Sequence, residues 1–205
     1  MAEALVIIGM PQGHWCKTSE DLMVVRIPMV NEAIARARQR GWMVIFGANR
    51  VEAWEAGDKP YPRGRRVPDI EPYVLPVESI TLPHWETGGG CVCTLGEDEE
   101  PCTPHNEPLV HFHSDLDIRP TDYCVGSMSA MVTLIRRHGL LRLYYGGAHT
   151  DMCVLTAPGG MAWIRYFVAC SFIPEISISH RLDEEETNRK VSELIPMVHL
   201  EDVLP

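Results

Sequence analysis

Two short apolar runs, separated by a helical pattern, constrain the fold of this chain more than any other feature. Leu5–Ile8 is continuous and ends at Gly9, and Trp42–Phe46 is a second run of the same kind. Such runs are typical of strands that are buried on both faces. Between them, apolar residues recur at helical spacing: Ile27, Val30, Ile34 and Ala37. Because Gly41 then stands where a helix would stop, we predict a βαβ unit with a parallel sheet.

The same alternation returns in the second half of the chain. Strands are expected at 109–113, 141–145 and 167–173, and helices at 128–139, 152–165 and 184–197. We therefore predict an α/β fold, a three-layer, doubly wound and mostly parallel sheet. The 205 residues suffice for one domain and are too few for two comfortable ones, so the prediction is a single domain over 1–205.

The stretch from about 49 to 108 interrupts this pattern. It holds 9 of the 16 prolines, three consecutive glycines at 88–90 and an acidic run at 97–100, and it has no clear period. Loops of this length in a compact domain are usually lids, binding loops or disordered segments. We expect a long irregular loop or lid inserted in the domain.

Charge and cysteine content exclude several classes of protein. The 18 Lys and Arg against 28 Asp and Glu argue against a nucleic-acid partner, which needs a basic face. No apolar run approaches the roughly 18 residues that span a bilayer, and no basic region precedes the first apolar run, so neither a membrane protein nor a secretory signal is expected. Because the seven cysteines are an odd number, we expect a reducing, cytoplasmic compartment.

In a doubly wound sheet, ligands bind beyond the carboxyl ends of the strands. Three loops qualify in this prediction: 9–16, 114–124 and 146–153. The last leaves a buried strand, turns on glycine and enters a helix with Cys153 in its first turn. The start of a helix lowers the pKa of a thiol and offers N–H groups to an oxyanion, which favours Cys153 as a nucleophile. The alternative is a small cysteine that packs the helix against the sheet.

Residues 146–155, Gly-Gly-Ala-His-Thr-Asp-Met-Cys-Val-Leu, resemble the nucleophile signature of the isochorismatase-like cysteine hydrolases, the superfamily of the nicotinamidases and N-carbamoylsarcosine amidases. The resemblance implies a parallel α/β sheet, homo-oligomers and hydrolysis of C–N amide bonds by an Asp-Lys-Cys triad. It makes Cys153 the nucleophile and the Ala148–His149 peptide a cis bond that shapes the oxyanion pocket. Some members of the superfamily also hold a metal beside the pocket.

This chain departs from the triad at two positions. Gly9 stands where the family has aspartate, and the nearest basic residue to the expected lysine is Arg119. Arginine stays protonated, so Arg119 is predicted to contact an anionic group rather than move a proton. His14 is the predicted proton acceptor. The missing side chain at Gly9 is expected to widen the pocket beside the thiol.

Two functions remain open from the sequence. The first is a cysteine-dependent hydrolase of a small amide, with Cys153 as nucleophile and no cofactor required. The second is a catalytically impaired protein that keeps the fold as a binding or assembly subunit. We expect Trp15 and Trp85 to line the substrate pocket, although they can also simply cover the edge of the sheet.

The long loop contains a second group of reactive side chains, Cys91, Cys93, Cys102 and His105. Thiolates and an imidazole in one short segment can build a tetrahedral zinc site that would order the loop. The spacing matches no common zinc motif well. Free thiols or a Cys93–Cys102 disulfide are the alternatives.

Overall fold

The predicted βαβ unit is present at the start of the chain. The computed structural model describes residues 2–47, 63–68, 91–93, 100, 102, 112–180 and 183–205. Strand β1 (Glu3–Ile8) is followed by helix α1 (Lys17–Gln39) and strand β2 (Met43–Gly47). The two strands pair in parallel, from Ala4 with Met43 to Ile8 with Gly47.

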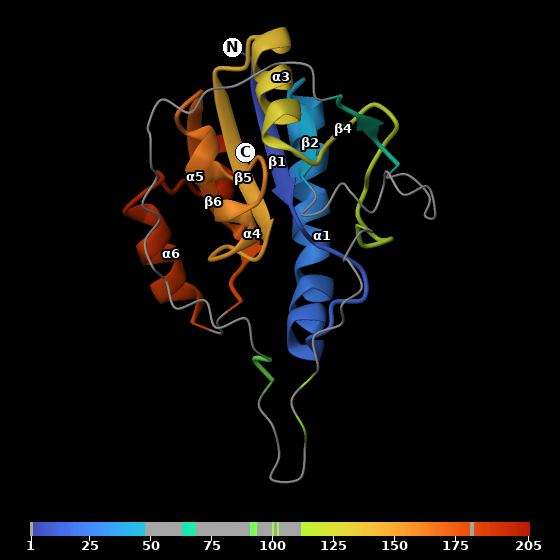
Figure 1. Ribbon diagram of the computed structural model, residues 1–205, viewed down its shortest axis with the longest axis vertical. Coiled ribbons are helices and arrows are strands. Elements are labelled where there is room, and N and C mark those ends of the chain that lie inside the picture. Colours follow the sequence, from blue (N-terminus) through green and yellow to red (C-terminus); the bar gives the residue numbers. More distant parts are fainter. Residues whose placement is uncertain are drawn as a thin grey trace.

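Six strands form one sheet in the order β3-β4-β2-β1-β5-β6 (Figure 1). The other four strands are β3 (Arg65–Arg66), β4 (Tyr123–Val125), β5 (Arg142–Ala148) and β6 (Ala169–Ile178). Every pair of neighbours is parallel, which confirms the predicted sheet. The chain builds outward from β1 through β2 in one direction and through β5 in the other, so the strand order reverses beside β1, where ligand sites of such sheets lie.

Helices cover both faces of the sheet and give three layers. The remaining helices are α3 (Met128–His138), α4 (Cys153–Thr156), α5 (Met161–Ile164), α6 (Glu184–Ser192) and α7 (Leu200–Val203). Apolar side chains of α3 to α6 form one buried cluster with one face of the sheet, and those of α1 and α7 form a second cluster with the other face. Alternate residues of β1 divide between the clusters, as expected of a strand buried on both sides.

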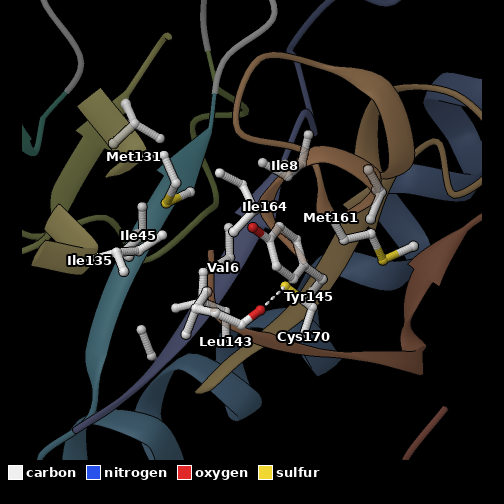
Figure 2. Close-up of a cluster of buried hydrophobic side chains, with 14 of the residues drawn as sticks. Val6, Ile8, Ile45, Met131, Ile135, Leu143, Tyr145, Met161, Ile164 and Cys170 are labelled. Carbon is white, nitrogen blue, oxygen red and sulfur yellow. Dashed lines mark hydrogen bonds between the residues drawn. The ribbon is translucent and has the colours of Figure 1, made fainter. Parts of the chain in front are cut away.

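The first of these clusters, shown in Figure 2, is centred on Tyr145 of β5, which is fully buried. Its hydroxyl donates a hydrogen bond of 2.9 Å to the carbonyl oxygen of Gly159. Burial raises the pKa of Tyr145 well above its ordinary value, so the phenol stays a donor. The bond ties the strand that precedes Cys153 to the turn that follows α4.

Two predicted elements are wrong. Of the strand expected at 109–113, residues 109–111 lie outside the described residues, and Phe112 forms only an isolated antiparallel bridge with Pro11. The strand beside β2 is β4, a segment of three residues that is too short to show a periodic pattern. The helix expected at 152–165 is interrupted between α4 and α5, since proline and glycine at 158–160 cannot continue a helix.

Most of the loop predicted at 49–108 lies outside the described residues. Its described part supplies β3, which adds an edge strand to β4. Among the described residues, no helix combines the length and the apolar character that a membrane crossing needs.

Candidate active site

The carboxyl ends of β1 and β5 meet at Gly9 and Ala148. Gly9 has a φ of +73°, and its N–H donates to the carbonyl oxygen of Gly47 at 3.0 Å. A Cβ atom at Gly9 would lie 2.0 Å from the carbonyl oxygen of Ala148. The expected widening of the pocket at Gly9 is therefore wrong, because the Ala148 carbonyl fills the space that a side chain would take.

The turn after β5 presents Cys153. The Ala148–His149 peptide is cis, as the resemblance implies, and Cys153 is the half-buried first residue of α4. The carbonyl oxygen of His149 accepts hydrogen bonds from the N–H groups of Met152 at 3.1 Å and Val154 at 3.0 Å. These two N–H groups are thus engaged within the turn and are not donors for an oxyanion.

The short length of α4 removes part of the argument for an activated thiol. α4 has four residues, whereas the sequence predicted a helix of several turns. A helix start carries a partial positive charge because many peptide dipoles align behind it, and a single turn aligns few. The prediction that the Cys153 thiol is activated then rests on the neighbouring side chains.

The loop that carries His14 is fixed by the first turn of α1. The N–H groups of Gly13 and His14 donate to the carboxylate of Glu20 at 3.0 and 2.7 Å. The N–H of Cys16 donates to Nδ1 of His14 at 3.1 Å, and the carbonyl oxygen of Cys16 lies 3.3 Å from the same nitrogen. The His14 ring is thus oriented by backbone groups on its own loop.

His14 belongs to a group of aromatic rings at the carboxyl edge of the sheet. Its ring centroid lies 5.1 Å from that of His149, 4.9 Å separates His149 from His180, and Trp15 stacks on His14 at 5.4 Å. The sequence analysis missed His180, which follows the carboxyl end of β6. The predicted strand ended at residue 173, five residues before β6 ends, so His180 was not recognised as a residue that follows the carboxyl end of a strand.

Burial favours the neutral form of His149 and of His14. Burial first, and then the nearby His14 and His180 rings, lower the pKa of His149 from 6.5 to about 3. Burial is also the main reason why the pKa of His14 falls below its ordinary value. Within the described part of the chain, Nε2 of His149 and Oδ2 of Asp151 are buried polar atoms without a hydrogen-bond partner. The other Asp151 oxygen accepts from the N–H of His180 at 2.8 Å, which joins the turn to β6.

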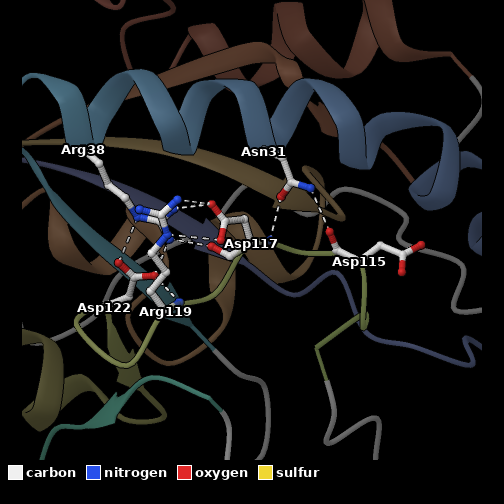
Figure 3. A network of polar contacts seen from close by, with 6 residues as sticks. All are labelled: Asn31, Arg38, Asp115, Asp117, Arg119 and Asp122. Carbon is white, nitrogen blue, oxygen red and sulfur yellow. Dashed lines mark hydrogen bonds and ion pairs between the residues drawn. The ribbon is translucent and has the colours of Figure 1, made fainter.

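Arg119 precedes β4 and lies at the amino edge of the sheet, opposite the candidate site and contrary to the prediction. Its guanidinium pairs with Asp117 at 3.1 Å, and its backbone N–H donates to the Asp122 carboxylate at 2.7 Å (Figure 3). Arg38, in the last turn of α1, bonds the same two carboxylates. β4 begins directly after Asp122, and all strands of the sheet are parallel. The network of Arg38, Arg119 and their carboxylates therefore lies at the amino ends of the strands. The segment 114–122 precedes β4 rather than following it, so Arg119 has no place in the candidate site.

A group of cysteines gathers around Cys16, at the end of the His14 loop. Sγ of Cys16 is 3.8 Å from Sγ of Cys93, which is 3.6 Å from Sγ of Cys102, and the sulfurs of Cys16, Cys91 and Cys93 all lie within 4.8 Å of one another. We call these four residues the thiol cluster. Hydrogen bonds, chiefly from Thr18, lower the pKa of Cys93 from 9.0 to about 6. Thiolates at this spacing are suited to zinc.

The cluster differs from the predicted metal set in one ligand. Cys16, 77 positions from Cys93, stands with the three cysteines of the long loop. His105 lies outside the described residues, as does Trp85. The described residues include all seven cysteines, and no two of them are joined in a disulfide.

Acid is expected to destabilise the protein through His149. Because its pKa is about 3 in the folded chain and 6.5 otherwise, the unfolded chain binds the extra proton between these values. The free energy of unfolding has its full value, as far as His149 is concerned, above pH 6.5. Below that pH it decreases by about 1 kcal/mol per pH unit. Urea unfolding of the wild type and of His149→Asn at several pH values measures it. The curves should converge toward low pH, and parallel curves would contradict the assignment.

Neither the family models nor the curated proteins that were searched contain a match to this sequence. Solved structures share the fold. An isochorismatase-like hydrolase from Alkaliphilus metalliredigens is 9% identical, with a TM-score of 0.60 and coverage of 100% of this chain and 98% of its own. The N-carbamoylsarcosine amidase of Thermoplasma acidophilum is 12% identical, with a TM-score of 0.57 and all of both chains covered.

A pyrazinamidase/nicotinamidase from Streptococcus mutans is 13% identical, with a TM-score of 0.52, and the match covers 96% of this chain and 100% of that one. Identities this low establish a common backbone architecture and leave the chemistry to the residues of the site. The strand order, the layers and these neighbours together show that the chain has the isochorismatase-like α/β fold.

Proposed function

We propose that this protein hydrolyses the C–N bond of a small amide, with Cys153 as the nucleophile. The observation that carries the proposal is the turn after β5, which holds a half-buried cysteine and His149, whose ring packs against His14 and His180. A cysteine on the same turn as a histidine, at the carboxyl edge of a parallel sheet, has the composition of a covalent hydrolase site. Trp15, which stacks on His14, is proposed to flank the substrate.

The proposed reaction has two steps. The Cys153 thiol gives its proton to His14, and its sulfur attacks the carbonyl carbon of the amide. The C–N bond breaks, and the amine leaves with the proton from His14. Water then attacks the thioester, which releases a carboxylic acid and restores the thiol. Neither step changes an oxidation state, and neither requires a cofactor.

His14 can accept this proton in one of its two neutral tautomers. When Nδ1 carries the proton and donates to the carbonyl oxygen of Cys16, Nε2 is an acceptor. When Nδ1 accepts from the N–H of Cys16, Nε2 carries the proton and acts as an acid. The proposed cycle uses the first arrangement to take the proton from sulfur.

Ammonia release from nicotinamide, pyrazinamide and N-carbamoylsarcosine tests the activity. In parallel, iodoacetamide labelling followed by peptide mapping compares Cys153 with the other cysteines across pH. The proposal predicts turnover of at least one small amide and labelling of Cys153 that the substrate suppresses. Labelling of Cys153 no faster than that of a free cysteine, together with no turnover, would contradict it.

Replacing His14 by glutamine is expected to lower kcat by about 10² to 10⁴, the usual contribution of a positioned proton acceptor. The matched control is His138→Gln. His138 ends α3 at the amino edge of the sheet, where its ring contacts Tyr123. Steady-state kinetics of both variants measure the effect, and equal kinetics for His14→Gln and the wild type would remove His14 from the mechanism.

Gly9 supports a second candidate function. The family aspartate has no counterpart at Gly9, and the 2.0 Å approach to Ala148 leaves no room for a side chain there. A chain that has lost this group can keep the fold as a binding or assembly subunit. The labelling experiment separates the candidates, since only the hydrolase needs a reactive Cys153 that the substrate protects.

We also propose that the protein is a homo-oligomer in a reducing, cytoplasmic compartment, with a small molecule as substrate. Oligomers are what the family resemblance implies, and seven cysteines without a disulfide fit a reducing environment. Sedimentation at micromolar concentration is expected to show a species larger than the 23.1 kDa chain. A stable monomer would contradict the assembly.

A further inference from the structure

The thiol cluster joins two parts of the chain that are far apart in sequence. Cys16 is the buried residue directly before α1, and Cys91, Cys93 and Cys102 come from the long loop. Figure 1 shows α1 as the long helix that runs along the sheet, with its first turn at the end toward the light-green pieces of this loop, 91–93, 100 and 102. The cluster is the contact through which Cys93 reaches the start of this helix.

Three of the sulfurs have a spacing that suits a metal site, since those of Cys16, Cys91 and Cys93 all lie within 4.8 Å of one another. Zinc binds thiolate sulfur at about 2.3 Å, so two sulfurs at the corners of a zinc tetrahedron lie about 3.8 Å apart. The measured separations from Cys93 are 3.8 Å to Cys16 and 3.6 Å to Cys102. A disulfide would need about 2.05 Å, far shorter than either distance.

A backbone donor faces the sulfurs of the cluster. The N–H of Cys93 lies 3.4 Å from Sγ of Cys91 and donates to it. Cys16 is the N-cap of a helix of 23 residues, and its side chain makes no capping hydrogen bond. Donors of this kind around thiolates are typical of metal ligands, whose charge and orientation they support.

We propose that Cys16, Cys91 and Cys93 bind a zinc ion, and that Cys102, whose sulfur is 3.6 Å from that of Cys93 but outside the group of three, supplies the fourth ligand. Each ligating thiol loses its proton to solvent as the Zn–S bond forms, and no electron is transferred. Four thiolates would fill the coordination of zinc, so the site is structural rather than catalytic. Cys16 thereby replaces His105 of the predicted set of zinc ligands.

Zinc at this position would hold the long loop against the start of α1. It would also restrain Cys16, whose N–H and carbonyl oxygen lie beside Nδ1 of His14. The ion is then a positioning element for the His14 loop. The binding itself does not depend on the proposed amidase activity, so each can fail without the other.

The metal content of the reduced full-length protein tests the site. Protein produced with zinc in the medium is expected to contain about one zinc per chain after gel filtration, measured by mass spectrometry of the metal. Cobalt exchanged for the zinc should give the intense d–d bands of a tetrahedral ion and a sulfur-to-cobalt charge-transfer band. These spectra report thiolate ligation directly and need no substrate.

Variants assign the ligands. Cys91→Ser and Cys93→Ser are expected to lower the affinity for zinc at least about tenfold, as is Cys16→Ser. The half-buried Cys91 keeps the test usable if the buried Cys16 variant fails to fold. Cys124→Ser is the matched control, because this buried cysteine lies outside the cluster and should leave the zinc content unchanged. His105→Ala should also retain zinc.

Four results would overturn the proposal. The first is reduced wild-type protein that binds neither zinc nor cobalt. The second is full zinc retention in Cys91→Ser and Cys93→Ser. The third is loss of zinc in His105→Ala with retention in Cys16→Ser, which would return the site to the ligands of the long loop. A disulfide among these cysteines in freshly reduced, metal-loaded protein would count equally against it.

Discussion

Replacing Cys153 by serine is expected to lower kcat/KM for the amide substrate by about 10³-fold or more. The thiol of a cysteine is a few per cent ionised near neutral pH, whereas a serine hydroxyl is not and needs a strong base. The proposed proton acceptor, His14, is a weaker base than a free imidazole because burial lowers its pKa, and the buried His149, with a pKa of about 3, is weaker still. The serine variant keeps the shape of the side chain, so its thermal stability should stay close to that of the wild type.

Cys170→Ser is the matched control for this experiment. Cys170 is buried in β6, its pKa is raised to about 12 by burial, and its Sγ donates to the carbonyl oxygen of Val168. A serine hydroxyl can make the same hydrogen bond, so this variant should retain activity. Unchanged turnover in Cys153→Ser, or an equal loss in both variants, would exclude Cys153 as the nucleophile.

Replacing Gly9 by alanine is expected to cost several kcal/mol of unfolding free energy. The φ of +73° strains any residue with a Cβ atom, and this Cβ would lie 2.0 Å from the Ala148 carbonyl oxygen. The oxygen belongs to the last residue of β5, a strand held between β1 and β6, so it cannot move without shifting the strands. Urea unfolding at neutral pH measures the loss.

The Gly13→Ala variant separates the cost of the positive φ from the cost of the steric clash with Ala148. Gly13 has a φ of +75°, close to that of Gly9, and a Cβ there would have nothing within 4 Å. It should lose only about 1 kcal/mol, the cost of a left-handed conformation for a residue with a side chain. Equal losses in the two variants would show that the contact with Ala148 carries no penalty. A much larger loss at Gly9 would also mean that an aspartate cannot be restored there by substitution.

The amino-acid sequence by itself determined the alternation of elements and the turn that bears Cys153. Buried apolar runs predicted β1, β2 and β5, and helical spacing ended by glycine predicted α1 and α3, where Gly139 adopts a φ of +58°. These patterns are local, since a strand or a helix shows its period within a few residues. β4 was not predicted, because its three residues are too few to show a hydrophobic period.

Only the tertiary structure decided which of these segments meet. The strand order places β1 between β2 and β5, so the Gly9 loop adjoins the Cys153 turn, while Arg119 lies before β4 at the other edge. It also brings Cys16 to Cys93 across 77 positions and sets His180 beside His149. No period or spacing in the chain encodes these contacts, because they depend on how parallel strands are ordered, and that order is settled by packing both faces of the sheet at once.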